Sequence, residues 1–272
     1  MTISVIVTTY NRPDALRAVL DGLGAQIDRD FEVLVADDGS RDDTRELVDA
    51  VRSRAPVAIR HVWQEDRGFR AGAVRNRATA QARGDYVIFL DGDCVPRPSF
   101  IARHRVLAEA GWMVAGNRIL LAEMFTKSAL EAKLPLHLWS DAQWRTARRR
   151  ADINRTLPLM YLPLGPLRKL AGSRWQRVRT CNLGVWRADL TRVNGFDEVF
   201  EGWGYEDSDL AVRLINSGVR RKEGAYATGV LHLWHRENDR RAEGENWERL
   251  QRRIRERATR AERGLDQYPS AV

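Results

Sequence analysis

The sequence has only two cysteines, Cys94 and Cys181, among its 272 residues. Two cysteines form neither a disulfide framework nor a paired-cysteine zinc site, and no run of 18 apolar residues exists that could span a bilayer. Residues 1–7 are apolar but lack the basic flank of a signal peptide. These absences predict a protein of the reducing cytoplasm.

Several signatures of nucleotide and hydrolytic enzymes are also missing. The sequence has no glycine-rich loop followed by Lys and Ser or Thr, no dinucleotide-binding fingerprint and no internal repeat. Its serines lack the glycine-flanked turn that presents a nucleophilic serine. These absences argue against the P-loop, dinucleotide-binding, repeat-protein and serine-hydrolase classes.

The composition is that of a globular protein, with 43% apolar residues and a net charge of +8. The charge favours anionic partners such as phosphorylated sugars, anionic lipid surfaces or nucleic acid. Arginine supplies most of the basic residues, and a codon bias can also produce this richness. The charge alone therefore assigns no partner.

Short apolar segments alternate with helical patterns along the chain. This alternation predicts an α/β fold, with a Rossmann-like, mostly parallel central sheet flanked by helices in a single domain. The expected strands are 3–8, 31–36, 57–62, 86–90, 112–117, 181–186 and 230–234. The expected helices begin at Pro13 and otherwise cover 42–51, 72–83, 99–110, 188–190, 210–217 and 237–263.

Carboxylates follow two of the expected strands. The strand 86–90 ends in Asp91, Gly92 and Asp93, and the strand 31–36 is followed by Asp37 and Asp38. Two hard oxygen donors at the carboxyl end of a parallel strand suit a divalent cation that carries phosphates. The alternative for an isolated Asp-Gly-Asp is an ordinary polar turn.

The segment 118–178 loses the regular alternation. It contains three consecutive arginines at 148–150 and a proline-interrupted apolar stretch at 157–164, which cannot form a straight helix. We expect an insertion of short helices that exposes apolar and basic groups together. Such a surface suits a lipid-linked acceptor or the cytoplasmic leaflet, and packing into the core is the alternative.

Taken in order, these segments resemble the family-2 glycosyltransferases of the GT-A fold. The resemblance rests on residues 9–12, 37–40, 72–76 and 91–93. The segment 194–209, dense in glycines, aromatics and acids, is similar to the carboxyl half of β-1,4-galactosyltransferases and of the N-acetylgalactosamine-transferring half of chondroitin polymerases. The resemblance covers 1–117 and 179–236.

The resemblance implies a division of labour along the chain. It implies a nucleotide-sugar-binding half at 1–117, the insertion at 118–178, an acceptor-binding half at 179–236, and a charged C-terminal helix and tail at 237–272. On the nucleotide side it implies that the uracil and ribose of a UDP-sugar are held by Thr9, Tyr10, Arg12 and Asp38, with Arg75, Asn76 and Asp91 also on that side.

The resemblance also implies the metal site and the catalytic groups. Asp91 and Asp93 match the metal motif, with Asp93 as the direct ligand; His235 is the preferred histidine ligand and His232 the second choice. The cofactor is then Mn²⁺ or Mg²⁺, and an imidazole ligand favours Mn²⁺. Asp207 takes the position of the catalytic base, with Glu206 beside it. Trp203, followed by Gly204, lines the sugar sites.

Two departures from the family pattern are informative. Ser208 stands where galactosyltransferases often have another acid, which changes the acceptor contacts. The Gln-x-x-Arg-Trp motif of processive synthases is missing, because Ala171 occupies the glutamine position before Arg174 and Trp175. We therefore expect the addition of one sugar per encounter.

The expected function is inverting, metal-dependent transfer of a hexose or N-acetylhexosamine from a UDP-sugar to a glycan or lipid-linked glycan. The expected setting is bacterial surface polysaccharide or lipopolysaccharide synthesis, with peripheral contact at the inner face of the membrane and no nucleic acid partner. The alternatives are a nucleotidyltransferase and a basic nucleic-acid- or membrane-binding protein without catalysis.

Several of these residues keep a purely structural alternative, and for Glu206 and Asp207 it is a solvated helix start, where the helix dipole favours acids. Asp38 suits a helix N-cap, and Arg12 suits a solvated loop charge. His232 suits a core histidine, and Trp203 suits core filling.

Overall fold

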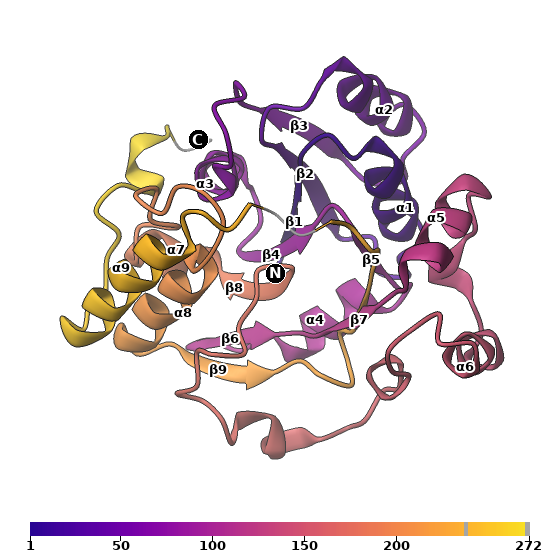
Figure 1. The fold of residues 1–272 in the computed structure, drawn as a ribbon. Helices are drawn as coiled ribbons and strands as arrows, with labels where there is room; N and C mark the ends of the chain where they lie inside the picture. The colour runs from indigo at the N-terminus through magenta and orange to yellow at the C-terminus, as the bar shows by residue number, and fades with distance from the viewer. Residues whose placement is uncertain (237–238, 270–272) are drawn as a thin grey trace.

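A seven-stranded sheet forms the centre of the computed structural model, which describes residues 1–236 and 239–269 (Figure 1). Residues 237–238 and 270–272 of the expected C-terminal segment lie outside the described residues. The strands are β1 (Ile3–Thr9), β2 (Phe31–Asp37), β3 (Ile59–Trp63), β4 (Tyr86–Asp91), β6 (Trp112–Ala115), β8 (Asn182–Trp186) and β9 (Arg220–Glu223). Their order in the sheet is β3-β2-β1-β4-β8-β6-β9.

The first four strands of this sheet are parallel, and β8 runs antiparallel between β4 and β6. The predicted mostly parallel α/β sheet is therefore confirmed. A second, three-stranded sheet consists of β5 (Cys94–Pro96), β10 (Val230–His232) and β7 (Arg118–Leu120). This small sheet joins the segment that follows Asp93 to the C-terminal half of the chain.

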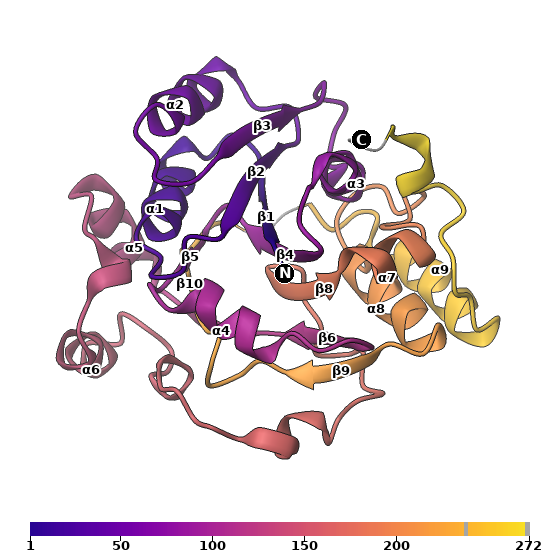
Figure 2. The ribbon, with the colours of Figure 1, turned by 180° about the vertical axis from the view of Figure 1, so that it is seen from behind.

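Helices cover both faces of the large sheet (Figures 1 and 2). Within β1, Val5 and Val7 pack toward the side of α1 (Pro13–Gly24) and α2 (Asp42–Arg52), whereas Ile6 packs with the side chains of α3 (Ala71–Gln81) and α8 (Glu206–Asn216). This alternation explains why the strand reads as a continuous apolar run. Outside the segment 118–178 the described residues also form α4 (Phe100–Leu107), α7 (Arg187–Arg192), α9 (Glu243–Arg255) and the 3-10 turn η4 (Leu265–Gln267).

The segment 118–178 contains short helices, as expected. They are α5 (Glu123–Glu131), α6 (Asp141–Arg149) and the 3-10 turns η1 (Leu136–Leu138), η2 (Leu157–Leu159) and η3 (Gly165–Lys169). Both alternatives for its apolar residues occur. Trp144 and Ile153 are buried in the main core, whereas Leu167 and Leu170 are exposed.

Strand β9 was missed by the sequence pattern because all four of its residues are charged. Arg221 and Lys222 are nevertheless buried. The Lys222 ammonium donates to the Leu107 carbonyl at 2.9 Å and pairs with Glu109 at 2.7 Å. These partners compensate the burial of the charge, which no hydrophobic pattern reveals.

The C-terminal helix is shorter than expected, at Glu243–Arg255 instead of 237–263. It is fixed by Leu250, which is fully buried, and by Arg253, which donates to Asp197 at 2.7 Å. Among the described residues, no helix is both long enough and apolar enough to cross a bilayer.

Candidate active site

The carboxyl ends of neighbouring parallel strands meet at one edge of the sheet. In register, Thr9 lies beside Asp37, and Thr8 lies beside Asp91. The Gly92 amide donates to the Thr8 carbonyl at 2.7 Å. A β-carbon at Gly92 would lie 2.9 Å from that oxygen, so the turn after Asp91 requires glycine. Open α/β sheets bind their ligands at this edge.

Arg75 of α3 joins two acidic motifs that are far apart in the sequence. Its guanidinium donates to Asp91 at 3.1 Å and to Glu206 at 3.2 Å, and also to the Thr8 hydroxyl at 3.0 Å. Arg75 is only 4% exposed. Burial opposes its charge, but the attraction of the nearby carboxylates, including Asp207, is larger and raises the pKa of Arg75. One permanent cation therefore holds both motifs together.

Glu206 and Asp207 occupy the first turn of α8 but differ in their surroundings. Burial and the adjacent Asp207 charge raise the pKa of Glu206, and its pairing with Arg75 offsets only part of this rise. Asp207 is half-buried and accepts a hydrogen bond from the Ser208 hydroxyl at 3.3 Å. In the described part of the chain Asp207 forms no ion pair. It is therefore the acid of the two that is open to a ligand.

Asp93 lies beside two histidines from the C-terminal half. Its carboxylate is 3.4 Å from His235 Nε2 and 3.8 Å from His232 Nε2. The small sheet positions them, because His232 is paired with Cys94 and the Leu233 amide donates to the Asp93 carbonyl. Burial lowers the pKa of His232 to about 4, so its imidazole is neutral at pH 7.

The hydrogen bonding of His235 tests whether a cation fits here. Its Nδ1 lies 2.6 Å from the Arg236 carbonyl oxygen, which can only accept. In the neutral imidazole the proton is therefore on Nδ1, and Nε2 presents a lone pair toward the Asp93 carboxylate. Two acceptors facing each other are both satisfied by a cation between them, and a carboxylate with imidazoles suits Mn²⁺. The residues present fit a divalent metal ion.

Asp38 stabilises the loop that leads into α3. It is 4% exposed and accepts hydrogen bonds from the Gln64 side chain at 2.6 Å and the Arg70 amide at 2.8 Å. Burial raises the pKa of Asp38, although these two hydrogen bonds oppose the rise. The helix-capping alternative is wrong, because the residue at the N-cap of α2 is Arg41.

The stretch after β1 presents different groups to the same edge. The Thr9 hydroxyl is buried without a hydrogen-bond partner among the described residues. Tyr10 is 49% exposed, and its hydroxyl donates to Asp66 at 2.9 Å. Arg12 forms an ion pair with Asp14 at 3.0 Å. The exposed Tyr10 ring is therefore the group available to a ligand, whereas the Thr9 hydroxyl lies buried behind it.

Comparisons with known protein families identify the chain. Residues 4–151 match Glycosyl transferase family 2, which is more than half of the chain, and residues 171–236 match the N-terminal domain of galactosyltransferase. The chain belongs to glycosyl transferase family 2. The family match continues past residue 117 into the segment expected to be an insertion.

Curated relatives of this glycosyltransferase are longer than it is. Validoxylamine A glucosyltransferase of Streptomyces hygroscopicus subsp. jinggangensis is 31% identical over 235 residues, which cover 80% of this chain and 52% of the relative. Chondroitin synthase of Escherichia coli is 29% identical over 243 residues, covering 83% of this chain and 34% of the relative. The chain thus spans about half, or less, of the length of these relatives.

Solved structures show the same fold. S. aureus TarS in complex with UDP-GlcNAc has a TM-score of 0.64 at 18% identity, covering 98% of this chain and 69% of that chain. The mannosyltransferase PcManGT from Pyrobaculum calidifontis, solved with GDP-Man and Mn²⁺, has a TM-score of 0.59 at 20% identity, covering 86% and 57%. The GT-A fold of the glycosyltransferase is therefore confirmed.

Asn76 is the expected site residue that lies apart from the others. It is fully buried, and its amide group donates to the Phe196 carbonyl at 2.8 Å and to Glu198 at 2.9 Å. Its oxygen accepts from the Phe196 amide at 2.8 Å. Asn76 therefore connects α3 to the segment before α8, and its amide group is engaged by these protein partners.

Trp203 is half-buried and outside the hydrophobic clusters, so it does not fill the core. The Arg240 guanidinium lies over its ring at 4.9 Å. Gly202 and Gly204 on either side have φ values of +74° and +112°, which residues with side chains rarely adopt. The two glycines therefore set the path of the backbone around the indole.

Arg118 and Gln64 were missed by the sequence reasoning. Arg118 lies 3.4 Å from His232; burial opposes its charge, but the neighbouring Cys181 and Cys94, followed by Asp91 and Asp93, raise the pKa of Arg118. It belongs to a three-residue strand that has no periodic signal. Gln64 directly follows β3, and a polar residue at that point is the one signal that could have indicated it.

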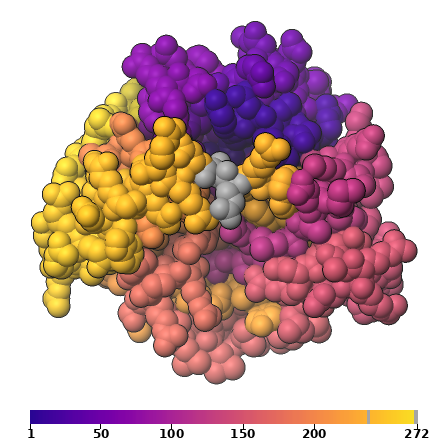
Figure 3. All heavy atoms as spheres, viewed as in Figure 1, coloured from indigo at the N-terminus to yellow at the C-terminus, as the bar shows by residue number. Residues whose placement is uncertain are grey.

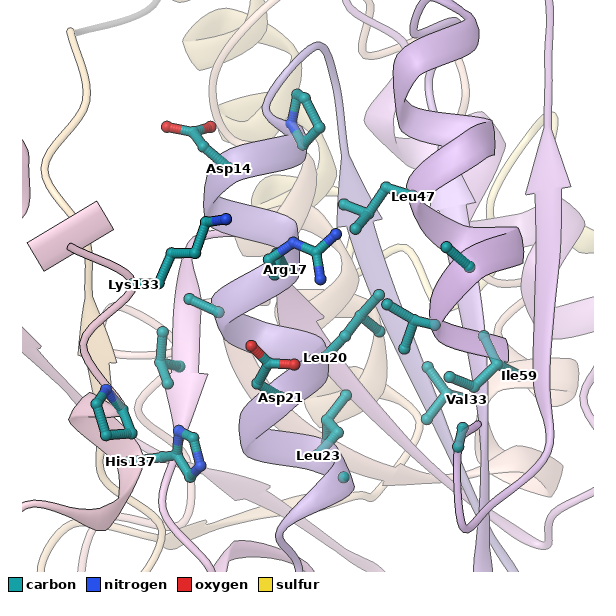
Figure 4. Close-up of a pocket in the computed structure, with 18 of the residues that line it drawn as sticks. Asp14, Arg17, Leu20, Asp21, Leu23, Val33, Leu47, Ile59, Lys133 and His137 are labelled. Atoms are coloured by element: carbon teal, nitrogen blue, oxygen red, sulfur yellow. The ribbon is translucent and has the colours of Figure 1, made fainter. Parts of the chain in front are cut away.

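A cavity of about 810 Å³ lies away from these residues, between α1, α2 and the insertion (Figure 4). Its walls include Leu20, Leu47 and Ile59, and Arg17 and Lys133 also line it. It contains none of the motif carboxylates or histidines. The chemistry of the site therefore lies at the strand ends and not in this cavity.

Proposed function

We propose that the chain is an inverting, metal-dependent glycosyltransferase that moves a hexose or N-acetylhexosamine from a UDP-sugar to a hydroxyl group of a glycan or lipid-linked glycan. The observation that carries this proposal is the bridge through Arg75, which holds the metal motif at Asp91 next to Glu206 and the open carboxylate of Asp207. A leaving-group site and a base are thus held in one place.

Asp207 is the proposed base. Its carboxylate accepts the proton of the acceptor hydroxyl while that oxygen attacks the anomeric carbon of the donor. The bond from the anomeric carbon to the diphosphate breaks with its electron pair on the leaving UDP. Attack from the side opposite to the leaving group inverts the configuration. Glu206 keeps α8 in place through Arg75 and does not move the proton.

Asp93, His235 and His232 are the proposed holders of a divalent cation, with Asp91 beside them. A bound Mn²⁺ or Mg²⁺ supplies positive charge to the diphosphate as the donor bond breaks. The exposed Tyr10 ring takes the uridine side, with the buried Thr9 behind it, Asp38 holding the adjoining loop and Arg12 at its rim. Trp203 and Gly204 take the sugars.

The names of relatives support the substrate class. The curated relatives include a glucosyltransferase and bacterial chondroitin and hyaluronan synthases, and S. aureus TarS was solved with UDP-GlcNAc. We propose that residues 1–117 bind the donor and that residues 179–236 bind the acceptor. We further propose that the reaction belongs to bacterial surface polysaccharide or lipopolysaccharide synthesis in the cytoplasm. In this arrangement the charged helix α9 packs against α8 and supports the acceptor half.

Calorimetric titration of UDP with and without Mn²⁺ tests the metal site. Asp93→Asn should remove most of the Mn²⁺-dependent gain in UDP affinity, because it deletes the charge between the two histidines. The control is Asp49→Asn on α2, an exposed acid that should leave the titration unchanged. Equal gains in the Asp93 variant and the unmodified protein would contradict the assignment.

A panel of UDP-sugars screened for Mn²⁺-dependent hydrolysis then tests the donor class. We expect one UDP-hexose or UDP-N-acetylhexosamine to be hydrolysed far faster than the others. Preference for a GDP-sugar would show that uracil is the wrong nucleobase for the donor.

A further inference from the structure

The net charge of the protein is concentrated in one segment. Residues 118–178 contain twelve Lys or Arg and four Asp or Glu, a net charge of +8 that equals the net charge of the whole chain. The rest of the chain is therefore neutral overall. A concentrated charge of this size creates a local field, whereas the same charge spread over the surface would not.

Many of these cations have no protein partner. Arg145, Arg148 and Arg149 on α6 and the following Arg150 are exposed, and within the described ranges none of them forms an ion pair or a side-chain hydrogen bond. Elsewhere in the segment Lys127 pairs with Glu123. The guanidinium groups of the α6 arginines are thus accessible to an external anion, because they form no ion pair among the described residues.

The same segment exposes aliphatic side chains. Of the 16 exposed large hydrophobic residues in the described chain, nine belong to 118–178. The most exposed are Leu170 at 81%, Met124 at 74% and Leu167 at 61%. Scattered single hydrophobic residues are normal on a surface, but such a concentration marks an interaction site.

The segment borders the face that carries the site. Figures 1 and 2 show it along one side of the molecule, from α5 and α6, and along its lower border, and Figure 3 shows it as the right and lower border of the face where the orange C-terminal residues meet the indigo N-terminal half. It is attached directly to the metal-site strand, because the Leu121 amide donates to the His232 carbonyl at 3.0 Å.

We infer that residues 118–178 are a docking surface for a lipid bilayer that contains anionic lipids. Cationic and aliphatic groups on one segment match the headgroup charge and the acyl region of a bilayer. Nucleic acid would be recognised mainly by stacking on aromatic side chains, and of the nine exposed hydrophobic residues only Tyr161 is aromatic. Tyr161 is itself covered by Arg103 at 3.5 Å.

Docking in this way would hold the mouth of the site close to the membrane. A lipid-linked acceptor could then enter without leaving the bilayer, and this consequence rests on the proposed function. Membrane binding itself does not rest on the proposed function, because it depends on residues that are separate from Asp93, Asp207 and the histidines.

Vesicle co-sedimentation tests the inference with the full chain. We expect binding to phosphatidylcholine vesicles that contain about one third phosphatidylglycerol, weak binding to phosphatidylcholine alone, and release at high salt. The triple variant Arg148→Gln, Arg149→Gln, Arg150→Gln should lose affinity on the order of a hundredfold. Its matched control is Arg45→Gln, Arg52→Gln, Arg54→Gln, three exposed arginines on and just after α2, which should bind as the unmodified chain does.

The aliphatic part has its own pair of variants. Leu167→Ser with Leu170→Ser should weaken vesicle binding, whereas Ile27→Ser with Val106→Ser, equally exposed elsewhere, should not. Equal losses in the test and control variants, or binding to single-stranded RNA in preference to vesicles, would overturn the inference.

UDP-sugar hydrolysis in detergent-free buffer separates the two proposals. A chain that hydrolyses a UDP-sugar but does not bind anionic vesicles refutes the docking surface and leaves the proposed function standing. A chain that binds the vesicles but hydrolyses none of the UDP-sugars supports the docking surface and refutes the proposed function.

Discussion

Charged side chains in the site are largely buried and paired, whereas those on α6 of the insertion (residues 118–178) are exposed. At the carboxyl edge of the sheet, Asp91, Glu206 and Arg75 are buried or half-buried and neutralise one another over short distances. On α6, Arg148 and Arg149 are exposed and form no ion pair or side-chain hydrogen bond within the part of the chain that the structure describes. A buried charge that loses its partner is costly, whereas an exposed one costs little. Substitutions at the two regions should therefore differ greatly in their effect on the folded protein.

The largest effect should come from Asp207→Asn. The amide keeps the shape of the side chain but cannot accept the acceptor proton, so kcat should fall by about 10²–10⁴-fold while UDP affinity is unchanged. Steady-state kinetics and UDP calorimetry measure the two quantities. The matched control is Glu201→Gln, an exposed acid of the same segment. Near-normal turnover by the Asp207→Asn variant would show that Asp207 is not the catalytic base.

Next comes Arg75→Gln, which leaves two carboxyl groups without their common cation. We expect a loss of about 3–5 kcal/mol in the free energy of unfolding, measured with urea. Arg45→Gln, which removes an exposed cation paired only with Asp42, should change it by less than about 1 kcal/mol. Similar losses for the two variants would show that the bridge does not hold the motifs together.

His104 adds a pH dependence to the comparison. It is fully buried, its Nε2 bonds to Asn182 at 3.1 Å, and its Nδ1 has no hydrogen-bond partner among residues 1–236 and 239–269. Burial lowers the pKa of His104 to about 4, whereas the unfolded value is about 6.5. The unfolded chain therefore binds more protons between these values, and stability falls as the pH drops through this window.

The expected loss is about 3 kcal/mol on going from about pH 6.5 to pH 4. Urea unfolding at several pH values should show a smaller decline for His104→Gln, which cannot take up this proton. The difference between the two curves isolates His104 from the carboxyl groups, which titrate in both proteins. Parallel curves would contradict the assignment.

The smallest effect on folding should come from the triple replacement of Arg148, Arg149 and Arg150 by Gln. These residues lie at the end of α6 and gain only a modest interaction with the helix dipole. The free energy of unfolding should change by about 1 kcal/mol or less. A large destabilisation would mean that the arginines serve the fold, and the contrast between the two regions would disappear.

The residues that could be predicted are those with a local signal. Asp91 and Asp93 come at and just after the end of a buried apolar strand, Pro13 stands in the first turn of α1, and Gly92 lies where a β-carbon would meet the Thr8 carbonyl oxygen. The fold class followed from the same alternation of apolar strands and helices. The identity of the family followed from the order of such motifs along the chain.

Other residues could not be predicted because their surroundings come from distant parts of the chain. The charged strand Arg220–Glu223 is stable in the sheet only because Glu109 and a backbone carbonyl meet Lys222. Asn76 lies next to a promising arginine, yet its neighbours Phe196 and Glu198 assign it to packing.

The sequence alone determined which groups are present and that they follow strand ends, because strand and helix periodicity are local properties. It determined that the acidic motifs 91–93 and 206–207 and the histidines at 232 and 235 are present. Only the tertiary structure decided that Arg75 joins the acidic motifs and that both histidines face Asp93. The reason is physical: partners are chosen by the distances that chain folding creates, and those distances are set by the packing of the whole sheet.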